Sequence, residues 1–155
     1  MVVTRLEAYF NEAQKHIELI DESLEVLEAP IKSYDDLTQL QRFALNALIF
    51  RFSKLQDLIG SKIFRNYLDF SGLNLSDMSF FDILKEIEKE SIVDIDSWDE
   101  LRELRNKIAH DYPQELDEML ESINLFIKRS HELIVISKKL EKKFHAIKNA
   151  RAKNH

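Results

Sequence analysis

The chain has 155 residues, of which 45% are hydrophobic and 32% charged, a balance that suits one water-soluble domain with a sizeable core. Only two glycines and two prolines are present, which argues against a turn-rich β fold, and the absence of cysteine excludes disulfides, thiolate metal sites and a cysteine nucleophile. The net charge of −6 argues against a protein that coats nucleic acid in general.

The first predicted helix begins at Thr4, because Thr4 and Glu7 have the spacing of a capping box, and it closes at Pro30. Its hydrophobic residues recur at steps of three and four, which places them on one face of a helix. These residues are Leu6, Phe10, Ala13, Ile17, Ile20, Leu24 and Leu27.

The second predicted helix begins at Asp35 or Asp36 and runs to about Phe70. Gly60 is its weak point, since a glycine inside a helix costs roughly 1 kcal/mol relative to alanine. We therefore expect a bend or a close helix contact there. The helix contains several aromatic residues, which we predict to be core residues rather than base-stacking platforms: Phe43, Phe50, Phe52 and Phe64.

Two further capping patterns follow in the chain. Ser79 and Asp82 predict the start of a third helix that continues to about Lys89. Ser97 and Glu100 have the same spacing and predict the start of a fourth helix.

Pro113 suits the first turn of a last helix. The apolar stripe of this helix includes Leu116, Leu120, Ile123, Ile127, Ile134, Ser137, Leu140 and Phe144. Together these elements predict an all-α fold, an antiparallel bundle of four to five helices, in a single domain over residues 1–147. We expect residues 148–155 to form a disordered basic tail.

Basic residues concentrate at the C-terminal end of the chain. Residues 128–155 carry nine Lys and Arg and two Glu, whereas the rest of the chain carries 13 basic and 26 acidic residues. This stretch either contacts RNA or an acidic partner, or forms a solvated helix face with a frayed end. No apolar run approaches ~18 residues and the N-terminus lacks a signal-peptide pattern, so we expect a cytoplasmic protein that binds neither a membrane nor DNA.

Metal binding is not indicated by the sequence. Four acidic residues lie close together, but they lack the spacing and the glycine of a calcium loop, and helix capping explains them better: Asp94, Asp96, Asp99 and Glu100. Four of the histidines have no ligand-like spacing: His16, His131, His145 and His155. We therefore expect no metal and no cofactor.

Asp57 lies among apolar neighbours in the second helix, and a carboxylate on an apolar face is costly unless it is paired. An arginine of the helix that follows residue 97 is a natural partner. The alternative is that Asp57 lies at the edge of the apolar stripe.

The stretch LRELRNKIAHDYP, residues 101–113, carries more polar groups than a helix end requires. Leu101, Leu104 and Ile108 form its inward face. Asn106 and His110 are four residues apart, so both project from one face of the helix. At ~100° per residue, Arg105 lies about 140° around the axis from His110. A straight helix does not bring these two together, so either the helix end is distorted or a second copy supplies the complement.

The chemistry of these residue types is coherent. Arginine binds phosphate in a fork, and histidine moves protons near neutral pH. Without a metal, the pair is sufficient for RNA cleavage, because the RNA 2′-OH can act as internal nucleophile. The structural alternative pairs Arg105 with Asp57, lets His110 cap carbonyls at the helix end, and makes Tyr112 a packing residue.

The segment RNKIAHDY fits the pattern R-x4-H-x-Y through Arg105, His110 and Tyr112, with Asn106 directly after the arginine. It resembles the HEPN superfamily, especially HEPN toxins encoded beside a minimal nucleotidyltransferase antitoxin. The resemblance covers most of the chain as an all-helical bundle, and these eight residues are its specific part.

The resemblance implies a metal-independent endoribonuclease that acts as a homodimer, with two motifs meeting in a composite cleft. It implies that His110 is the general acid or base, that Arg105 stabilises the transition state, and that Asn106 orients His110 or the phosphate. It further implies that the partner nucleotidyltransferase neutralises the toxin by adenylylating Tyr112. The antitoxin needs ATP and magnesium, whereas this chain needs neither.

Two other functions stay open. Proteins with this motif can instead serve as non-catalytic substrate-binding partners of the nucleotidyltransferase. The amphipathic stripes alone would also suit a plain helical scaffold, in which Arg105 and His110 affect stability but no activity.

Overall fold

A computed structural model of the chain describes residues 1–28, 30–111 and 119–154, apart from the side chain of Asp111. This part of the chain is all-helical, as the sequence predicts. Its α-helices are α1 (Val2–Val26), α2 (Gln39–Leu58), α3 (Phe64–Phe70), α4 (Phe80–Lys89), α5 (Ile95–Asp111) and α6 (Leu120–Lys153). Because a π-helical segment, Ile59–Ile63, joins α2 to α3 without a break, the described residues form five helices.

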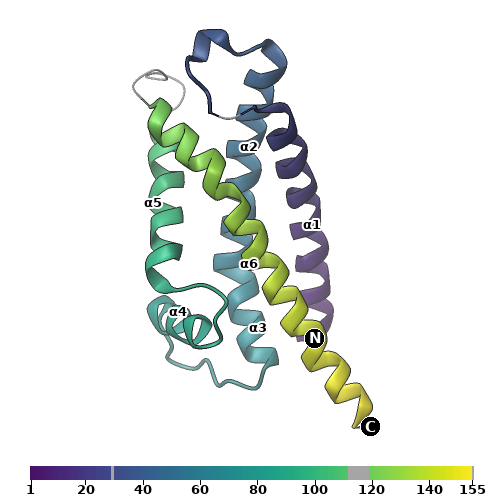
Figure 1. The fold of residues 1–155 in the computed structure, drawn as a ribbon. Coiled ribbons are helices and arrows are strands. Elements are labelled where there is room, and N and C mark those ends of the chain that lie inside the picture. Colours follow the sequence, from purple (N-terminus) through teal and green to yellow (C-terminus); the bar gives the residue numbers. More distant parts are fainter. Residues whose placement is uncertain (29, 112–118, 155) are drawn as a thin grey trace.

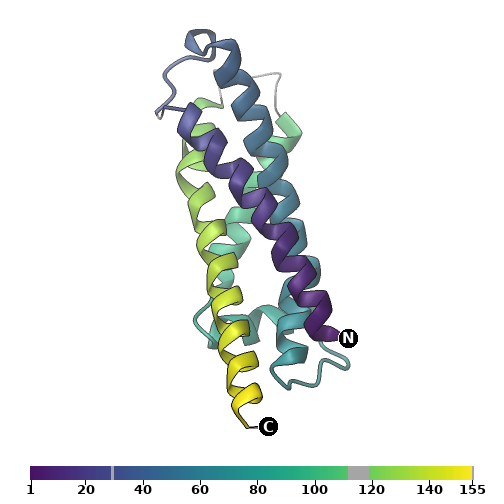
Figure 2. The same ribbon diagram turned by 90° about the vertical axis from the view of Figure 1, so that its right-hand side faces the viewer.

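The four long helices run up and down in alternation and form an antiparallel bundle (Figures 1 and 2). In the order of the chain, α1 packs along α2 and α3, α5 packs against α2, and α6 crosses the bundle in contact with α1, α2 and α5. The short helix α4 lies at the end of the bundle where both termini lie (Figure 1). The predicted antiparallel bundle is therefore confirmed.

The core is built from the apolar stripes that the sequence predicts. Leu6, Phe10, Ala13, Ile17 and Ile20 of α1 are all buried. Aromatic pairs connect distant elements, with ring centroids 4.7 Å apart in Phe52–Phe126 and 5.1 Å apart in Phe70–Phe144. Tilted ring pairs at such distances add stabilisation beyond the buried area alone.

The starts of the first two helices differ from the prediction. α1 begins at Val2 with no side-chain cap, so Thr4 lies inside the helix. The residues Tyr34–Asp36 form a single 3-10 turn, and α2 begins only at Gln39. Thr38 is its cap: the Thr38 Oγ1 accepts from the Gln41 backbone N–H at 3.1 Å, and the Gln41 Oε1 accepts from the Thr38 N–H at 2.9 Å. This reciprocal capping box satisfies two backbone donors at the start of α2.

Gly60 marks a real irregularity, as expected. It lies in the π-helical segment Ile59–Ile63, which shifts the faces of α3 relative to those of α2. A Cβ at Gly60 would lie 3.0 Å from Cζ2 of Trp98 in α5, closer than ordinary van der Waals contact. The glycine therefore permits close packing of this segment against α5.

The two later capping predictions have opposite outcomes. Ser79 and Asp82 form a capping box at the start of α4, as predicted, with hydrogen bonds of 3.0 and 3.1 Å. The prediction for Ser97 and Glu100 is wrong, because α5 already begins at Ile95. The Asp94 carboxylate accepts hydrogen bonds from the backbone N–H of Ser97 at 2.7 Å and from its hydroxyl at 3.0 Å. Asp94, three residues before Ser97, thus stands at the start of the helix, where the sequence pattern had placed Ser97.

The C-terminal segment is more ordered than predicted. α6 continues to Lys153, so the residues from Lys148 to Lys153 are helical, and the prediction of a disordered tail is wrong over that range. Lys148 forms an ion pair with Glu7 at 2.6 Å, and the Arg151 guanidinium donates to the Phe70 carbonyl at 2.6 Å. The predicted helix start at Pro113 lies outside the described residues. No helix in the described part of the chain has both the length and the apolar character needed to cross a membrane.

Candidate functional site

α5 presents its motif residues on the outer surface of the bundle. Leu101 and Ile108 are buried and Leu104 is partly buried, so the inward face is the predicted one. Asn106 and His110 are exposed. The motif residues are therefore accessible while the helix that carries them is anchored in the core.

Arg105 is held by two oxygen atoms. Its Nη2 lies 2.6 Å from Oδ1 of Asp57 in α2, and its Nη1 donates to Oδ1 of Asn106 at 2.8 Å. The expected pairing of Asp57 with an arginine of the motif helix is confirmed. The side chain of Asp57 is 62% exposed, however, so this carboxylate lies at the edge of the apolar face rather than inside it.

This pair orients Arg105 more than it stabilises the fold. Ion pairs with one largely exposed partner contribute roughly 0.2–1 kcal/mol, because water screens the attraction. Two acceptors on neighbouring helices nevertheless fix the plane of the guanidinium, whose side chain is only 22% exposed. A guanidinium with a fixed plane is a better phosphate ligand than a mobile one.

Arg105 and His110 are not brought together within one chain by a distorted helix. α5 is α-helical through Asp111, so that alternative is wrong and the angular separation of the two residues stands. No hydrogen bond or ion pair joins His110 to another described residue, so the expected capping role of His110 is not seen within this range. Tyr112 lies outside the described residues.

The structure also reveals a pocket that the sequence did not indicate. It has a volume of about 360 Å³ and lies between the α2–π segment and α5. Arg105, Asp57 and Asn106 line it together with two more arginines, Arg65 and Arg102.

The inner part of this pocket contains unsatisfied polar groups. Gln56 is 2% exposed, and neither its amide nitrogen nor its amide oxygen has a hydrogen-bond partner among the described residues. The same holds, within this part of the chain, for Nε1 of the buried Trp98 and Nε of Arg105. Buried polar groups are rarely left unpaired, and four of the six such atoms among the described residues belong to this pocket; the other two are His16 Nε2 and Arg42 Nε. The sequence indicated the lining of this pocket only in part. Arg102 precedes Arg105 by three residues and Asn106 by four, so the three side chains share one face of α5.

A stripe of exposed hydrophobic residues runs along α2. Leu40, Phe43 and Phe50 are 63%, 59% and 53% exposed, so the prediction that Phe43 and Phe50 are core residues is wrong. Phe52 and Phe64 are buried, as predicted. Phe43, Phe50 and Asp57 follow one another at steps of seven residues, so they lie on one side of α2. This is the side that faces the arginine of α5, because Asp57 pairs with that arginine.

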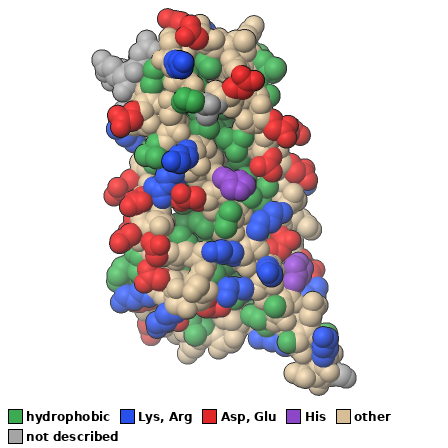
Figure 3. All heavy atoms as spheres, viewed as in Figure 1, with side chains coloured by type: hydrophobic (Ala, Val, Ile, Leu, Met, Phe, Trp, Pro, Cys, Tyr) green, Lys and Arg blue, Asp and Glu red, His purple; other side chains and the backbone are tan. Residues whose placement is uncertain are grey.

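The basic C-terminal stretch is largely a helix face. Lys and Arg side chains gather over the lower half of the view in Figure 3, which the C-terminal part of α6 crosses. Several of them have partners: Lys138 donates to the amide oxygen of Gln14 in α1 at 2.7 Å, and Arg129 forms ion pairs with Glu100 of α5 at 3.0 Å and with Glu132 of α6 itself at 3.1 Å. These contacts favour the interpretation of a solvated helix face over that of a free basic surface.

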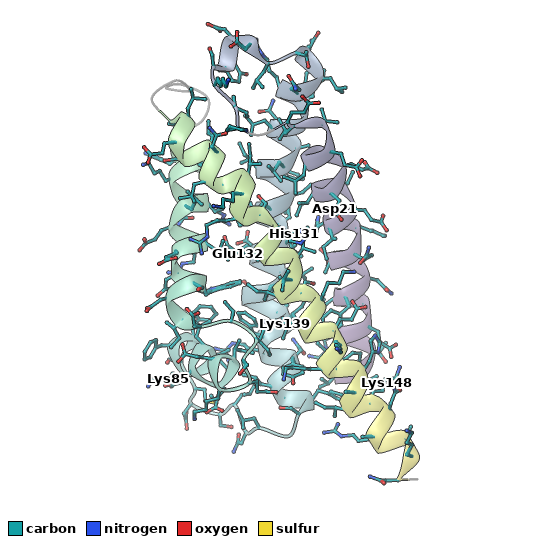
Figure 4. All side chains as sticks on the ribbon, viewed as in Figure 1. Asp21, Lys85, His131, Glu132, Lys139 and Lys148 are labelled. Atoms are coloured by element: carbon teal, nitrogen blue, oxygen red, sulfur yellow. The ribbon has the colours of Figure 1, made fainter. Side chains whose placement is uncertain are left out.

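A larger pocket, of about 590 Å³, lies between α6 and the residues that connect α4 to α5. His131, Glu132 and Lys139 of α6, labelled in Figure 4, line it together with Glu88 and Asp94. Its charges are mixed, and none of the unpartnered buried atoms noted above belongs to it. Among the described residues, no group of three His, Asp or Glu is placed to hold a metal ion.

Comparisons of the chain with protein-family models, with curated proteins and with solved structures found no match. The resemblance to HEPN toxins therefore stays a prediction that rests on the residues of the motif. The geometry of those residues within the bundle is what bears on function.

Proposed function

We propose that the chain is a HEPN-type toxin, a metal-independent endoribonuclease that works as a homodimer. The observation that carries the proposal is the arrangement of Arg105, which Asp57 and Asn106 hold on the accessible face of an all-helical bundle. The exposed His110 follows on the same helix. This is the residue set that phosphate binding and proton transfer require.

In the proposed reaction, His110 of one copy removes the proton from an RNA 2′-OH, whose oxygen then bonds to the adjacent phosphorus. The bond from phosphorus to the 5′-oxygen breaks, and that oxygen receives a proton from a histidine in its imidazolium form. Arg105 stabilises the negative charge that develops on the phosphate oxygens. The products are a 2′,3′-cyclic phosphate and a 5′-hydroxyl.

The exposed stripe on α2 supports a homodimer. Leu40, Phe43 and Phe50 are large hydrophobic side chains on one helix and each is more than half exposed, which suits an interaction surface. A second copy packed there would cover this face and bring its own motif helix close to Asp57 and Arg105. With two motifs in one cleft, Arg105 of one copy and His110 of the other act on the same RNA, so the two residues of a single helix do not have to lie together.

Growth of a host that expresses the chain alone tests the ribonuclease. We expect arrest by the unaltered chain, relief by His110→Ala, and continued arrest by the control His131→Ala, which alters an exposed histidine of α6. Purified protein should cleave RNA in the presence of EDTA. Intact RNA, combined with undiminished toxicity of His110→Ala, would refute the proposal.

The dimer has a separate test. Phe50→Glu places a charge in the α2 stripe, and we expect it to yield a monomer in light scattering and to lose cleavage activity. Phe81→Glu is the matched control, because Phe81 is 52% exposed but lies on α4. A Phe50→Glu protein that still forms the same dimer would remove this surface from the proposal.

A second candidate is a non-catalytic subunit that presents Tyr112 to a nucleotidyltransferase. It is favoured by the lack of any described partner that would orient His110, since catalytic histidines are usually oriented by a hydrogen bond. Coexpression with the product of the neighbouring gene, followed by intact-mass measurement, tests it. An adenylyl mass that disappears in Tyr112→Phe but persists in Tyr9→Phe, from a protein that never cleaves RNA, would favour this candidate.

A further inference from the structure

The pocket between α2 and α5 combines two kinds of recognition groups. Its outer part is cationic: Arg65, Arg102 and Arg105 line it against the single carboxylate of Asp57. This local excess of positive charge stands out in a chain whose net charge is −6. Arginine at such a site favours phosphate, because the guanidinium donors match two phosphate oxygens.

Arg102 is the most available of the three arginines. It is exposed, and within the described residues no hydrogen bond or ion pair engages it. Arg65 is half-buried and donates to the Met78 carbonyl at 3.4 Å, which is a long contact. Both can therefore turn toward an anion without the loss of a strong partner.

The inner part of the pocket is built differently. The amide of Gln56 offers one donor and one acceptor side by side, and no described residue pairs with either. The indole N–H of Trp98 is a further unused donor. An unpaired buried polar group costs roughly 1–3 kcal/mol, so a ligand that pairs with these atoms recovers an unfavourable free energy already present in the fold.

A nucleobase has the complementary chemistry. The edge of each base carries a donor and an acceptor next to each other, and glutamine pairs with such an edge through two hydrogen bonds. Proteins that bind single-stranded RNA read base edges in this way and stack the base on an aromatic ring or a guanidinium. Phe80 lines the pocket and is only partly buried, so it and Arg102 offer such surfaces.

We infer that this pocket binds one nucleotide, with its base toward Gln56 and Trp98 and its phosphate at the arginines. The volume of about 360 Å³ falls within the usual range for small-molecule sites, roughly 300–1,000 Å³. The claim that the pocket binds one nucleotide of an RNA substrate rests on the proposed function. The claim that it binds a free mononucleotide does not, so the proposed function and the nucleotide site can fail separately.

The π-helical segment explains why the pocket exists. Gly60 lies in this segment and lets the backbone approach Trp98 closely, while Gln56 and Asp57 precede it on α2. Such segments occur often at functional sites because they redirect side chains within a helix. Here the segment places Gln56 and Trp98, from two helices, in one pocket.

Binding of ribonucleoside 5′-monophosphates to the full chain tests the inference. Trp98 is the only tryptophan, so its fluorescence reports on the pocket, and calorimetry provides a second signal. We expect at least one of the four monophosphates to bind saturably and at least about tenfold more tightly than inorganic phosphate or the matching nucleoside. No binding at millimolar concentration, or equal binding of phosphate alone, overturns the inference.

Variants locate the binding. Gln56→Leu and Arg102→Gln are each expected to weaken binding by about tenfold or more, since hydrogen bonds that involve buried or charged groups are worth that much. Arg5→Gln, at an exposed arginine of α1 outside the pocket, is the control and retains wild-type affinity. Gln56→Leu should keep or raise the melting temperature, because it removes an unpaired buried amide. Unchanged affinity in both pocket variants refutes the site.

His110→Ala separates this inference from the ribonuclease. His110 does not line the pocket, so the variant should bind the monophosphate as tightly as the unaltered chain while it loses cleavage. Nucleotide binding by a protein that never cleaves RNA leaves the pocket standing and removes the proposed function. Cleavage of RNA that Gln56→Leu does not slow would show that the RNA substrate does not use this pocket, and it leaves the ribonuclease.

Discussion

Replacing Gly60 with alanine sets helix propensity against packing at a single position. Within a helix, alanine is favoured over glycine by roughly 1 kcal/mol, so propensity alone predicts a more stable protein. The added Cβ, however, would lie 3.0 Å from Cζ2 of Trp98. Ordinary contact begins at 3.4 Å, so the ring or the backbone must retreat by about 0.4 Å.

Trp98 has little room to retreat. It is 1% exposed, and the Phe64 ring packs against it with centroids 4.9 Å apart. Overpacking of a tight core typically costs 1–3 kcal/mol. Subtracting the gain in propensity leaves an expected loss of about 1 kcal/mol in the free energy of unfolding, or roughly 2–4 °C in melting temperature for a domain of this size.

Urea unfolding at fixed protein concentration, followed by Trp98 fluorescence and by circular dichroism, measures this loss. Ser61→Ala is the matched control, because Ser61 lies in the same π-helical segment but is exposed, and it should be neutral or slightly stabilising. Gly72→Ala is a useful contrast: space around Gly72 is open, but its φ of +104° disfavours a side chain. A Gly60→Ala protein that is about 1 kcal/mol more stable would show that Trp98 yields and that this reasoning is wrong.

Three further predictions concern single contacts. In a double-mutant cycle of Asp57→Asn and Arg105→Gln, urea unfolding should give a coupling of roughly 0.2–1 kcal/mol; a value above about 2 kcal/mol would contradict the orienting role of this exposed pair. Burial, and next the charge of Arg51, lower the pKa of His16 below its ordinary 6.5, so the unfolded chain binds more protons and stability falls as the pH drops below about 6.5 toward the folded-state pKa. His16→Gln should remove this slope in pH-dependent unfolding, and an unchanged slope would assign it to other groups. Ser79→Ala breaks the capping box of α4 and should lower the free energy of unfolding by roughly 0.5–2 kcal/mol in thermal melts, whereas unaltered stability would mean that the cap contributes nothing.

The histidine prediction rests on a specific geometry. The Arg51 guanidinium can only donate, so Nδ1 of His16, 3.3 Å from Nη1, must accept. The proton of the neutral ring therefore sits on Nε2, which has no hydrogen-bond partner in the part of the chain that the structure describes and lies 3.9 Å from the carboxylate of Glu12. A second proton would have to occupy Nδ1 and break the contact with Arg51, which agrees with the lowered pKa.

Helix starts show the limits of local patterns. The pattern of a hydroxyl residue followed three positions later by an acidic or amide residue occurs at Thr4, Thr38, Ser79 and Ser97, among other positions, and of these four only Thr38 and Ser79 cap a helix. At the fourth position, Asp94 accepts the Ser97 donors and starts the helix earlier. A capping motif thus identifies candidates, and competition with neighbouring acceptors selects among them.

The sequence was also a partial guide to the candidate site. The cost of an unpaired carboxylate among apolar residues predicted that Asp57 pairs with an arginine of the motif helix. The pair forms, but Asp57 is 62% exposed, so that cost is not its cause. Gln56 gave no such signal, since an uncharged amide beside a stripe of leucines is equally compatible with a surface position. Phe43 and Phe50 were misleading for the opposite reason: large aromatic side chains are usually buried, and here they are exposed.

The sequence by itself determined the all-helical fold, the buried stripes of α1 and α6 and the spacing of the motif on α5, because hydrophobic periodicity and helical geometry act over a few residues. Only the tertiary structure decided how α2 and α5 are aligned. That alignment depends on the packing of Trp98 against Gly60 and on the π-helical turn, which bring together side chains far apart in the chain. The Asp57–Arg105 pair and the pocket around Gln56 both follow from it, since interhelical register is set by buried side-chain shape rather than by local sequence pattern.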